Sequence, residues 1–445
     1  SSQLSCNQYF RTALSSLWSA ILAAGNSAAI NVIEFSGRLG ALKYPFFRRY
    51  WLGSFASVGA TQLQVMALGW LLFELTESTL MLGYLGAAAS IPTLAMTLFG
   101  GALADSIDKR KLMLGTSFLM TLLLAWLAVL DYLEIVTPWH IIVIAAAISF
   151  ITGFDWPART AIMPSLIERD EMFSAVALNA IVWQSSRMIV PALGGLILVV
   201  ADTWVAFVLC TAGFFSMFLV MLSMNLKLPG LSSQGSPLEK VAEGVRFIWH
   251  EPTFLILTIL SFAAMGFGFA YIQLMPAFSA ILSLDESGYG FLISATGFGS
   301  VAGTLLIGDF QRSKNLGRLM LATALASCFF LYGFTVMTSI FKHSDLAFAI
   351  CVGCVFAASA LNSMFMIMAL TVLQLRVPEE LRGRVLGIHG MCYSFGPLGG
   401  LAAGALAGYV TTSGAIAVLA SCYVALIAVI ALRYSVIRNL SGQTA

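Results

Sequence analysis

Charged side chains are scarce in this sequence. Only 10% of its 445 residues are Asp, Glu, Lys or Arg, whereas 59% are hydrophobic, and the mean hydropathy is +0.90. Soluble domains carry about 25% charged residues, so this composition excludes a soluble enzyme. The net charge of +2 is also too small to indicate a nucleic-acid partner.

The sequence also lacks the motifs of several kinds of chemistry. It contains no GxxxxGKS/T phosphate loop, no HExxH and no GxSxG, so we predict no enzyme activity, no cofactor and no ATP hydrolysis. The seven cysteines lie mostly inside apolar runs, and the one close pair, Cys351 and Cys354, has no histidine or acid beside it. This pattern predicts neither a disulfide framework nor a metal site.

Twelve apolar stretches of about 20 residues, the length that crosses a bilayer, dominate the chain instead. They lie at 50–73, 80–103, 112–131, 139–164, 174–199 and 203–225, and then at 253–277, 288–308, 318–338, 345–374, 384–408 and 412–433. The two blocks of six span 176 and 181 residues, as a duplicated unit would. We therefore expect an all-α polytopic membrane protein made of two six-helix bundles.

One long polar connection, which includes the helix-like stretch EKVAEGVRFIWHE, separates the two blocks. The expected domains are an N-terminal tail (1–45), a first bundle (46–226), a cytoplasmic linker (227–251), a second bundle (252–433) and a C-terminal tail (434–445). Residues 12–33 are uncharged but rich in Ser, Ala, Asn and Gly. That composition favours an interfacial helix or a tail over an extra span.

The basic residues predict the orientation. Of 23 Lys and Arg, twenty fall in segments that the span order puts on one side, and only Lys342 falls on the other. Cytoplasmic loops are enriched in Lys and Arg, so we predict that both termini are cytoplasmic.

Two motifs recur between the halves. GGALADSIDKRK (100–111) follows the second span and AGTLLIGDFQRSKNLGR (302–318) follows the eighth, with 204 residues between their aspartates. An acid at a helix end beside a basic cluster can pair with a neighbouring helix in one conformation and release it in another, although the basic residues alone could simply set topology. The residues of this predicted gating loop are Gly101, Asp105, Lys109, Arg110 and Asp309.

The second recurring motif is rich in proline and glycine. PALGG (191–195) lies in the fifth span and PLGG (397–400) lies in the eleventh, 206 residues later. Glycines let helices approach closely, and prolines bend them. We expect bends and close contacts between the bundles at Pro191, Gly194, Gly195, Pro397, Gly399 and Gly400.

With these motifs the chain resembles the major facilitator superfamily over about 390 residues, from 44 to 433. The loop 100–111 looks like the superfamily's signature loop, but Ser106 stands where a basic residue is common and Asp108 stands where glycine is common. The stretches 157–195 and 377–390 are similar to the branch that contains the enterobactin exporter and macrolide efflux pumps. The resemblance implies a monomer whose two pseudo-symmetric bundles rock about a central cavity, and export of a small molecule, usually coupled to protons.

Three charged residues lie well within predicted spans, away from their ends: Asp155, Arg159 and Arg187. Charges at membrane depth are costly and are functional candidates by default. Asp155 and Arg159 are four residues apart on one helix face, which suits an ion pair. The depth of Arg187 in the membrane, calculated from the helical rise per residue, puts it within reach of Asp155. We predict a polar network at the cavity with Asp155 as the proton-coupling residue; the alternative is a static network that locks the fourth span to the fifth.

Spans one, four, seven and ten line the cavity in proteins of this superfamily, and the fifth span adds polar and aromatic residues. Amides, aromatics and methionines there suit a large amphipathic ligand, although each could instead serve packing, lipid contact or helix pairing. The cavity candidates are Gln62, Gln64, Trp70, Trp156, Asn179, Trp183, Gln184, Tyr271, Gln273, Met275, Asn362 and Met366.

These observations predict a proton-coupled exporter of a small amphipathic molecule in a bacterial inner membrane, in contact with lipids and using neither nucleic acid nor ATP. Two embedded arginines favour an anionic or catechol-bearing ligand, such as a siderophore, over a cationic drug. One alternative is a lysophospholipid flippase of the same fold. The other is a transporter-like scaffold or assembly factor without turnover.

Overall fold

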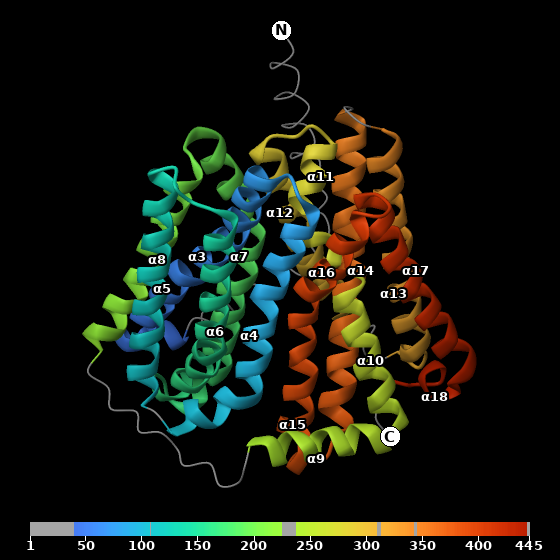
Figure 1. The fold of residues 1–445 in the computed structure, drawn as a ribbon. Helices are drawn as coiled ribbons and strands as arrows, with labels where there is room; N and C mark the ends of the chain where they lie inside the picture. Colours follow the sequence, from blue (N-terminus) through green and yellow to red (C-terminus); the bar gives the residue numbers. More distant parts are fainter. Residues whose placement is uncertain (1–39, 107, 225–236, 309–312, 342–344, 443–445) are drawn as a thin grey trace.

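The computed structural model describes residues 40–106, 108–224, 237–308, 313–341 and 345–442 (Figure 1). Within these ranges all regular structure is helical, and eleven helices are long and apolar enough to cross a membrane. The predicted all-α polytopic fold is confirmed. Most of the predicted N-terminal tail lies outside the described residues.

The first half contains six long helices. They are α3 (Pro45–Thr76), α4 (Thr79–Ser106), α5 (Lys109–Tyr132), α6 (Pro138–Ile162), α7 (Met172–Val200) and α8 (Thr203–Ser223), with the short 3-10 helices η2 (Gly40–Lys43), η3 (Met163–Ser165) and η4 (Arg169–Glu171). Each long helix overlaps one of the first six predicted spans.

The second half is less regular. After the linker helix α9 (Pro237–His250) come α10 (Pro252–Gly266), η5 (Ala270–Ile272), α11 (Met275–Ile281), α12 (Glu286–Leu306), α13 (Leu316–Ile340), α14 (Asp345–Arg376), α15 (Glu379–Gly390), η7 (Met391–Ser394), α16 (Phe395–Ala407), α17 (Thr412–Arg433) and α18 (Ser435–Arg438).

Two predicted spans are broken rather than continuous. The seventh runs through α10, η5 and α11, and the eleventh runs through α15, η7 and α16. In each case the second α-helix has a proline in its first turn, Pro276 in α11 and Pro397 in α16. Proline has no N–H and clashes with the preceding turn inside a helix, but it fits where a helix starts. The sequence therefore favours a new start at these points.

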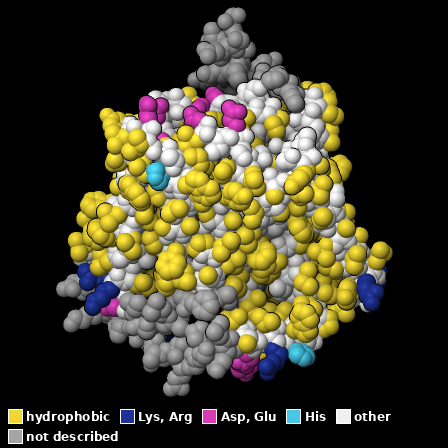
Figure 2. All heavy atoms as spheres, viewed as in Figure 1, with side chains coloured by type: hydrophobic (Ala, Val, Ile, Leu, Met, Phe, Trp, Pro, Cys, Tyr) yellow, Lys and Arg dark blue, Asp and Glu magenta, His cyan; other side chains and the backbone are white. Residues whose placement is uncertain are grey.

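The two halves stand side by side, with α9 lying across one end beneath α15 (Figure 1). We call this the linker end and the opposite one the far end. Lys and Arg side chains appear at the linker end, acidic side chains gather at the far end, and a broad apolar belt lies between them (Figure 2). This distribution is typical of a membrane-spanning protein.

The halves meet closely in their far-end portions. Helix α7 packs against α12, and α4 packs against α16. At Gly195 an added Cβ would lie 2.6 Å from the carbonyl oxygen of Glu286, and at Gly86 it would overlap the carbonyl oxygen of Pro397. Only glycine allows backbones to approach this closely, so both crossings depend on it.

Candidate substrate cavity and buried charges

Asp155 and Arg159 form the buried ion pair that their spacing predicts. Both lie on α6, and Nε of Arg159 donates to Oδ2 of Asp155. The side chains are only 9% and 10% exposed, respectively. The second carboxylate oxygen accepts a hydrogen bond from the Thr116 hydroxyl at 2.8 Å.

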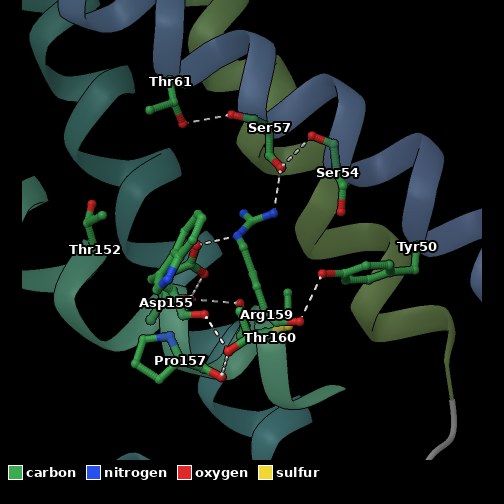
Figure 3. Close-up of polar contacts among 12 residues, drawn as sticks. Tyr50, Ser54, Ser57, Thr61, Thr152, Asp155, Pro157, Arg159 and Thr160 are labelled. Carbon is green, nitrogen blue, oxygen red and sulfur yellow. Dashed lines mark hydrogen bonds and ion pairs between the residues drawn. The ribbon is translucent and has the colours of Figure 1, made fainter. Parts of the chain in front are cut away.

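Helix α3 holds the other side of Arg159 (Figure 3). The guanidinium donates from Nη1 to the Ser57 hydroxyl at 3.1 Å, and the Tyr50 hydroxyl donates to the backbone carbonyl of Arg159 at 3.3 Å. A buried charge needs such partners to offset its desolvation. The pair therefore connects α5, α6 and α3 within the first half.

A small cavity opens beside this pair, lined by residues of α3, α6, α7 and the start of η3. Its edge-to-face pair of Trp156 and Trp183 has ring centroids 5.1 Å apart. Trp156 is 51% exposed although it lies in a predicted span. The lining residues are Tyr50, Ser54, Val58, Trp156, Arg159, Thr160, Met163, Asn179 and Trp183.

Arg187 lies apart from this network. Among the described residues no carboxylate forms an ion pair with it, so the structure does not bring it to Asp155 as the depth arithmetic suggested. It lies near the middle of α7, where a Cβ added to Gly297 of α12 would be 2.5 Å from its carbonyl oxygen. The Arg187 side chain therefore leaves α7 at the crossing of the two halves.

A second cavity, of about 140 Å³, begins at this crossing and is lined by both halves. The first half supplies Gln184 and Arg187, and the second half supplies hydroxyl and apolar side chains. Its lining is completed by Met265, Phe269, Ser300, Thr304, Ser363, Met366, Ile367 and Tyr393. The cavity thus combines several hydrogen-bonding groups with a cation that has no carboxylate partner in the described part of the chain.

The predicted cavity residues divide into three groups. Trp156, Asn179 and Trp183 line the cavity at Arg159, while Gln184 and Met366 line the cavity at Arg187. The others line neither of these two cavities: Gln62, Gln64, Trp70, Tyr271, Gln273, Met275 and Asn362.

Several of this third group serve helix packing. Trp70 stacks on Tyr289 with centroids 5.4 Å apart, Asn362 donates to the carbonyl oxygen of Ala264 at 3.2 Å, and Met275 is fully buried. Gln64 and Tyr271 are buried, and Gln62 is half-buried. Gln273 donates from Nε2 to the carbonyl oxygen of Leu82 at 3.0 Å, which joins the two halves.

The predicted gating loop is described only in part. Gly101 and Asp105 belong to the last turns of α4, but the surroundings of Gly101, the side chain of Asp105 and all of Asp309 lie outside what the structure describes. Lys109 is buried at the start of α5. Arg110 donates from Nε and Nη2 to the carbonyl oxygens of Met221 and Leu222, each at 3.0 Å, and so caps the end of α8.

The proline–glycine motifs lie where the halves meet. Helix α7 continues through the buried Pro191, and Gly194 packs on Leu63 of α3 while Gly195 faces α12. In α16, Gly399 faces α10 and Gly400 faces Gln273. Pro397 lies in the first turn of α16, directly after the break in the eleventh span.

Sequence reasoning missed most of the second half's contribution. Ser300, Thr304, Ser363 and Tyr393 line the Arg187 cavity but carry no motif of their own. One signal was present: Tyr393 stands four residues before Pro397, where a helical carbonyl would clash with the proline ring.

The chain is similar in sequence to a known family and to known transport proteins. The profile of a family described as transmembrane secretion effector matches residues 36–443. The staphyloferrin A transporter of Staphylococcus aureus is 25% identical over 348 residues, 76% of this chain and 83% of that protein. The enterobactin exporter EntS of Shigella boydii is 25% identical over 351 residues, 78% of this chain and 81% of that protein.

Solved structures share the architecture at lower identity. The nucleoside transporter NupG superposes with a TM-score of 0.69 at 15% identity, covering 87% of this chain and 99% of its own. A bacterial ferroportin homologue in an inward-facing state gives 0.65 at 14% identity, covering 86% and 98%. At this low sequence identity, the similarity shows a shared fold.

Proposed function

Because the chain belongs to the transmembrane secretion effector family of the major facilitator superfamily, we propose that it exports a small anionic molecule of the siderophore class. Members of this superfamily are membrane transporters and not enzymes. Two relatives that match about three quarters of the chain are named for siderophores, enterobactin and staphyloferrin A. That shared substrate class supports the proposal.

The observation that carries the proposal is the unpaired charge of Arg187. Asp155 neutralises Arg159, so the embedded charges leave one positive charge, and it lies in the cavity between the halves. A guanidinium at membrane depth without a carboxylate partner is costly. An anionic ligand would supply the missing partner, because arginine binds acidic oxygens with a planar fork of donors.

The contacts between the halves support alternating access. Among the described residues, three hydrogen bonds join the halves in their far-end portions. Tyr289 donates to the Met66 carbonyl at 3.2 Å, Gln273 donates to the Leu82 carbonyl at 3.0 Å, and Thr79 donates to the Gly404 carbonyl at 3.4 Å. The Arg187 cavity lies between the same two halves. The far end is therefore closed, and export requires these contacts to open.

The small volume of the Arg187 cavity also supports alternating access. A volume of about 140 Å³ is room for only a few water molecules, whereas small-molecule sites usually enclose about 300–1,000 Å³. A siderophore-sized ligand needs the halves to separate further at the linker end. Rocking of one half against the other provides that space.

Proton coupling is assigned to Asp155. Its carboxylate holds Arg159 and Thr116 together, so protonation would release the guanidinium toward the adjacent cavity. A buried carboxylate that pairs with an arginine is suited to such a switch, because losing one partner's charge leaves the other uncompensated. The coupling ion is thus taken to be a proton.

We place the protein in a bacterial inner membrane as a monomer surrounded by lipid, with the linker end and both termini cytoplasmic. The excess of Lys and Arg on the linker side supports this orientation.

The test is uptake driven by a pH gradient into inside-out vesicles. The panel is a catecholate siderophore, a macrolide, a cationic dye and a lysolipid, each with wild type, Arg187→Ala and the control Arg246→Ala, which alters an exposed arginine of α9. Siderophore uptake that Arg187→Ala abolishes and Arg246→Ala preserves is the expected result. Uptake of the dye or lysolipid alone, unaffected by Arg187→Ala, would overturn the proposal.

A further inference from the structure

The break in the eleventh span puts one side chain in an unusual place. Between α15 and α16 the chain forms the 3-10 turn η7, near the middle of the span. Irregular backbone at membrane depth is tolerated only where it is buried in protein or lines a cavity, and a 3-10 stretch within a helical span often marks a functional position. The side chains of η7 are therefore candidates for a functional role.

Tyr393 of η7 faces the space between the halves. It is 56% exposed, whereas its neighbour Cys392 is buried in the protein. Tyr393 and Arg187 line the same cavity. The exposed face of Tyr393 is thus turned toward the cavity that contains the unpaired cation.

The depths of Tyr393 and Arg187 match. Arg187 lies near the middle of α7 (172–200), and Tyr393 lies at the middle of 379–407. Each lies beside a close crossing of the halves: Gly297 of α12 meets the carbonyl of Arg187, and Gly86 of α4 meets the carbonyl of Pro397. The two side chains therefore occupy the same level of the cavity from opposite halves.

We propose that η7 is the second half's part of the substrate site, and that the Tyr393 hydroxyl donates to the acidic oxygen that Arg187 neutralises. This assignment rests on the proposed function, because it takes the ligand to be an anion. The arginine supplies charge, and the phenol supplies a directional hydrogen bond. Since the two groups belong to different halves, one ligand oxygen would hold both halves together, and its loss would free them to separate.

Pro397 accounts for the helix break beside Tyr393. In a continuous helix the carbonyl of Tyr393 would meet the ring of Pro397, so the helix restarts at Phe395. The 3-10 turn that precedes α16 carries Tyr393, which lines the cavity.

The experiment is equilibrium binding of a catecholate siderophore, and of its fully O-methylated analogue, to the purified full-length protein. The variants are Tyr393→Phe, Arg187→Ala and the control Tyr409→Phe, which alters a 90% exposed tyrosine at the far end of the same half. Tyr393→Phe keeps the ring and removes only the hydroxyl. A hydrogen bond to a charged group corresponds to about tenfold or more in affinity.

The assignment predicts that Tyr393→Phe weakens siderophore binding about tenfold, leaves binding of the methylated analogue unchanged, and matches wild type in thermal unfolding. Tyr409→Phe should change nothing. If Arg187→Ala abolishes binding while Tyr393→Phe binds like wild type, or if Tyr393→Phe weakens both ligands equally, the role of η7 is wrong and the proposed function stands. If wild type binds neither ligand, the anion site fails, and this assignment fails with it.

Discussion

The glycine crossing of α7 and α12 gives the sharpest structural prediction. A Cβ added at Gly297 would lie 2.5 Å from the carbonyl oxygen of Arg187 and 3.0 Å from its carbonyl carbon. Both atoms are backbone, so no side chain can rotate away. Ordinary contact begins at 3.4 Å, so Gly297→Ala requires the helices to move apart by roughly 1 Å.

This clash is present when the far end is closed and is relieved when it opens. Overpacking by one methyl group costs about 1–3 kcal/mol, which corresponds to a shift of about 5- to 150-fold in the equilibrium between the two states. Gly297→Ala should therefore raise the population that is open at the far end.

The assay is a distance measurement between spin labels on cysteines placed at Glu134 and Tyr409, at the far ends of the two halves, in a background without the seven native cysteines. Two controls are available. Gly353→Ala adds a methyl group where nothing lies within 4 Å, and Gly303→Ala overlaps the Ala360 carbonyl within the second half.

Gly297→Ala should add a longer distance, Gly353→Ala should match wild type, and Gly303→Ala should lower thermal stability without changing the distance. A folded Gly297→Ala protein with the wild-type distance distribution would refute the view that this crossing holds the far end closed.

Three further predictions follow from individual contacts. Tyr289→Phe removes the hydroxyl that donates to Met66 at 3.2 Å, so the same spin-label pair should show about five- to tenfold more of the open form; no change would mean that this bond is not a latch. Asp155→Asn should abolish uptake driven by a pH gradient in vesicles but keep downhill counterflow, because Arg159 loses its titratable partner; gradient-driven uptake at the wild-type rate would exclude the coupling role. Arg110→Ala removes two hydrogen bonds that cap α8 and should lower thermal stability by about 2–4 °C, with transport by the folded protein retained; a variant that unfolds at the wild-type temperature would show that the cap adds no stability.

Much of the fold was predictable because the bilayer imposes simple requirements. A span must be long and apolar, and loops on the two sides differ in basic residues. The ion pair of Asp155 and Arg159 was predictable as well, because residues four apart on a helix must lie on one face. Both inferences depend only on local sequence.

The cavity was harder to predict because it depends on how helices from different halves meet. Depth arithmetic gives the height of Arg187 in the membrane but not the direction of its side chain, and the structure turns it toward α12 instead of Asp155. The hydroxyls of Ser300 and Ser363 resemble any others in apolar helices until packing brings them to one cavity. Tyr393 required a further step, because Pro397 breaks the span where hydropathy predicts a continuous helix.

The most direct test of the account is a structure of the full-length protein saturated with a catecholate siderophore. We predict ligand density in the cavity between the halves, with an acidic oxygen between the guanidinium of Arg187 and the phenol of Tyr393. Density confined to the cavity beside Arg159, or a cavity at Arg187 that stays empty at saturating ligand, would contradict it.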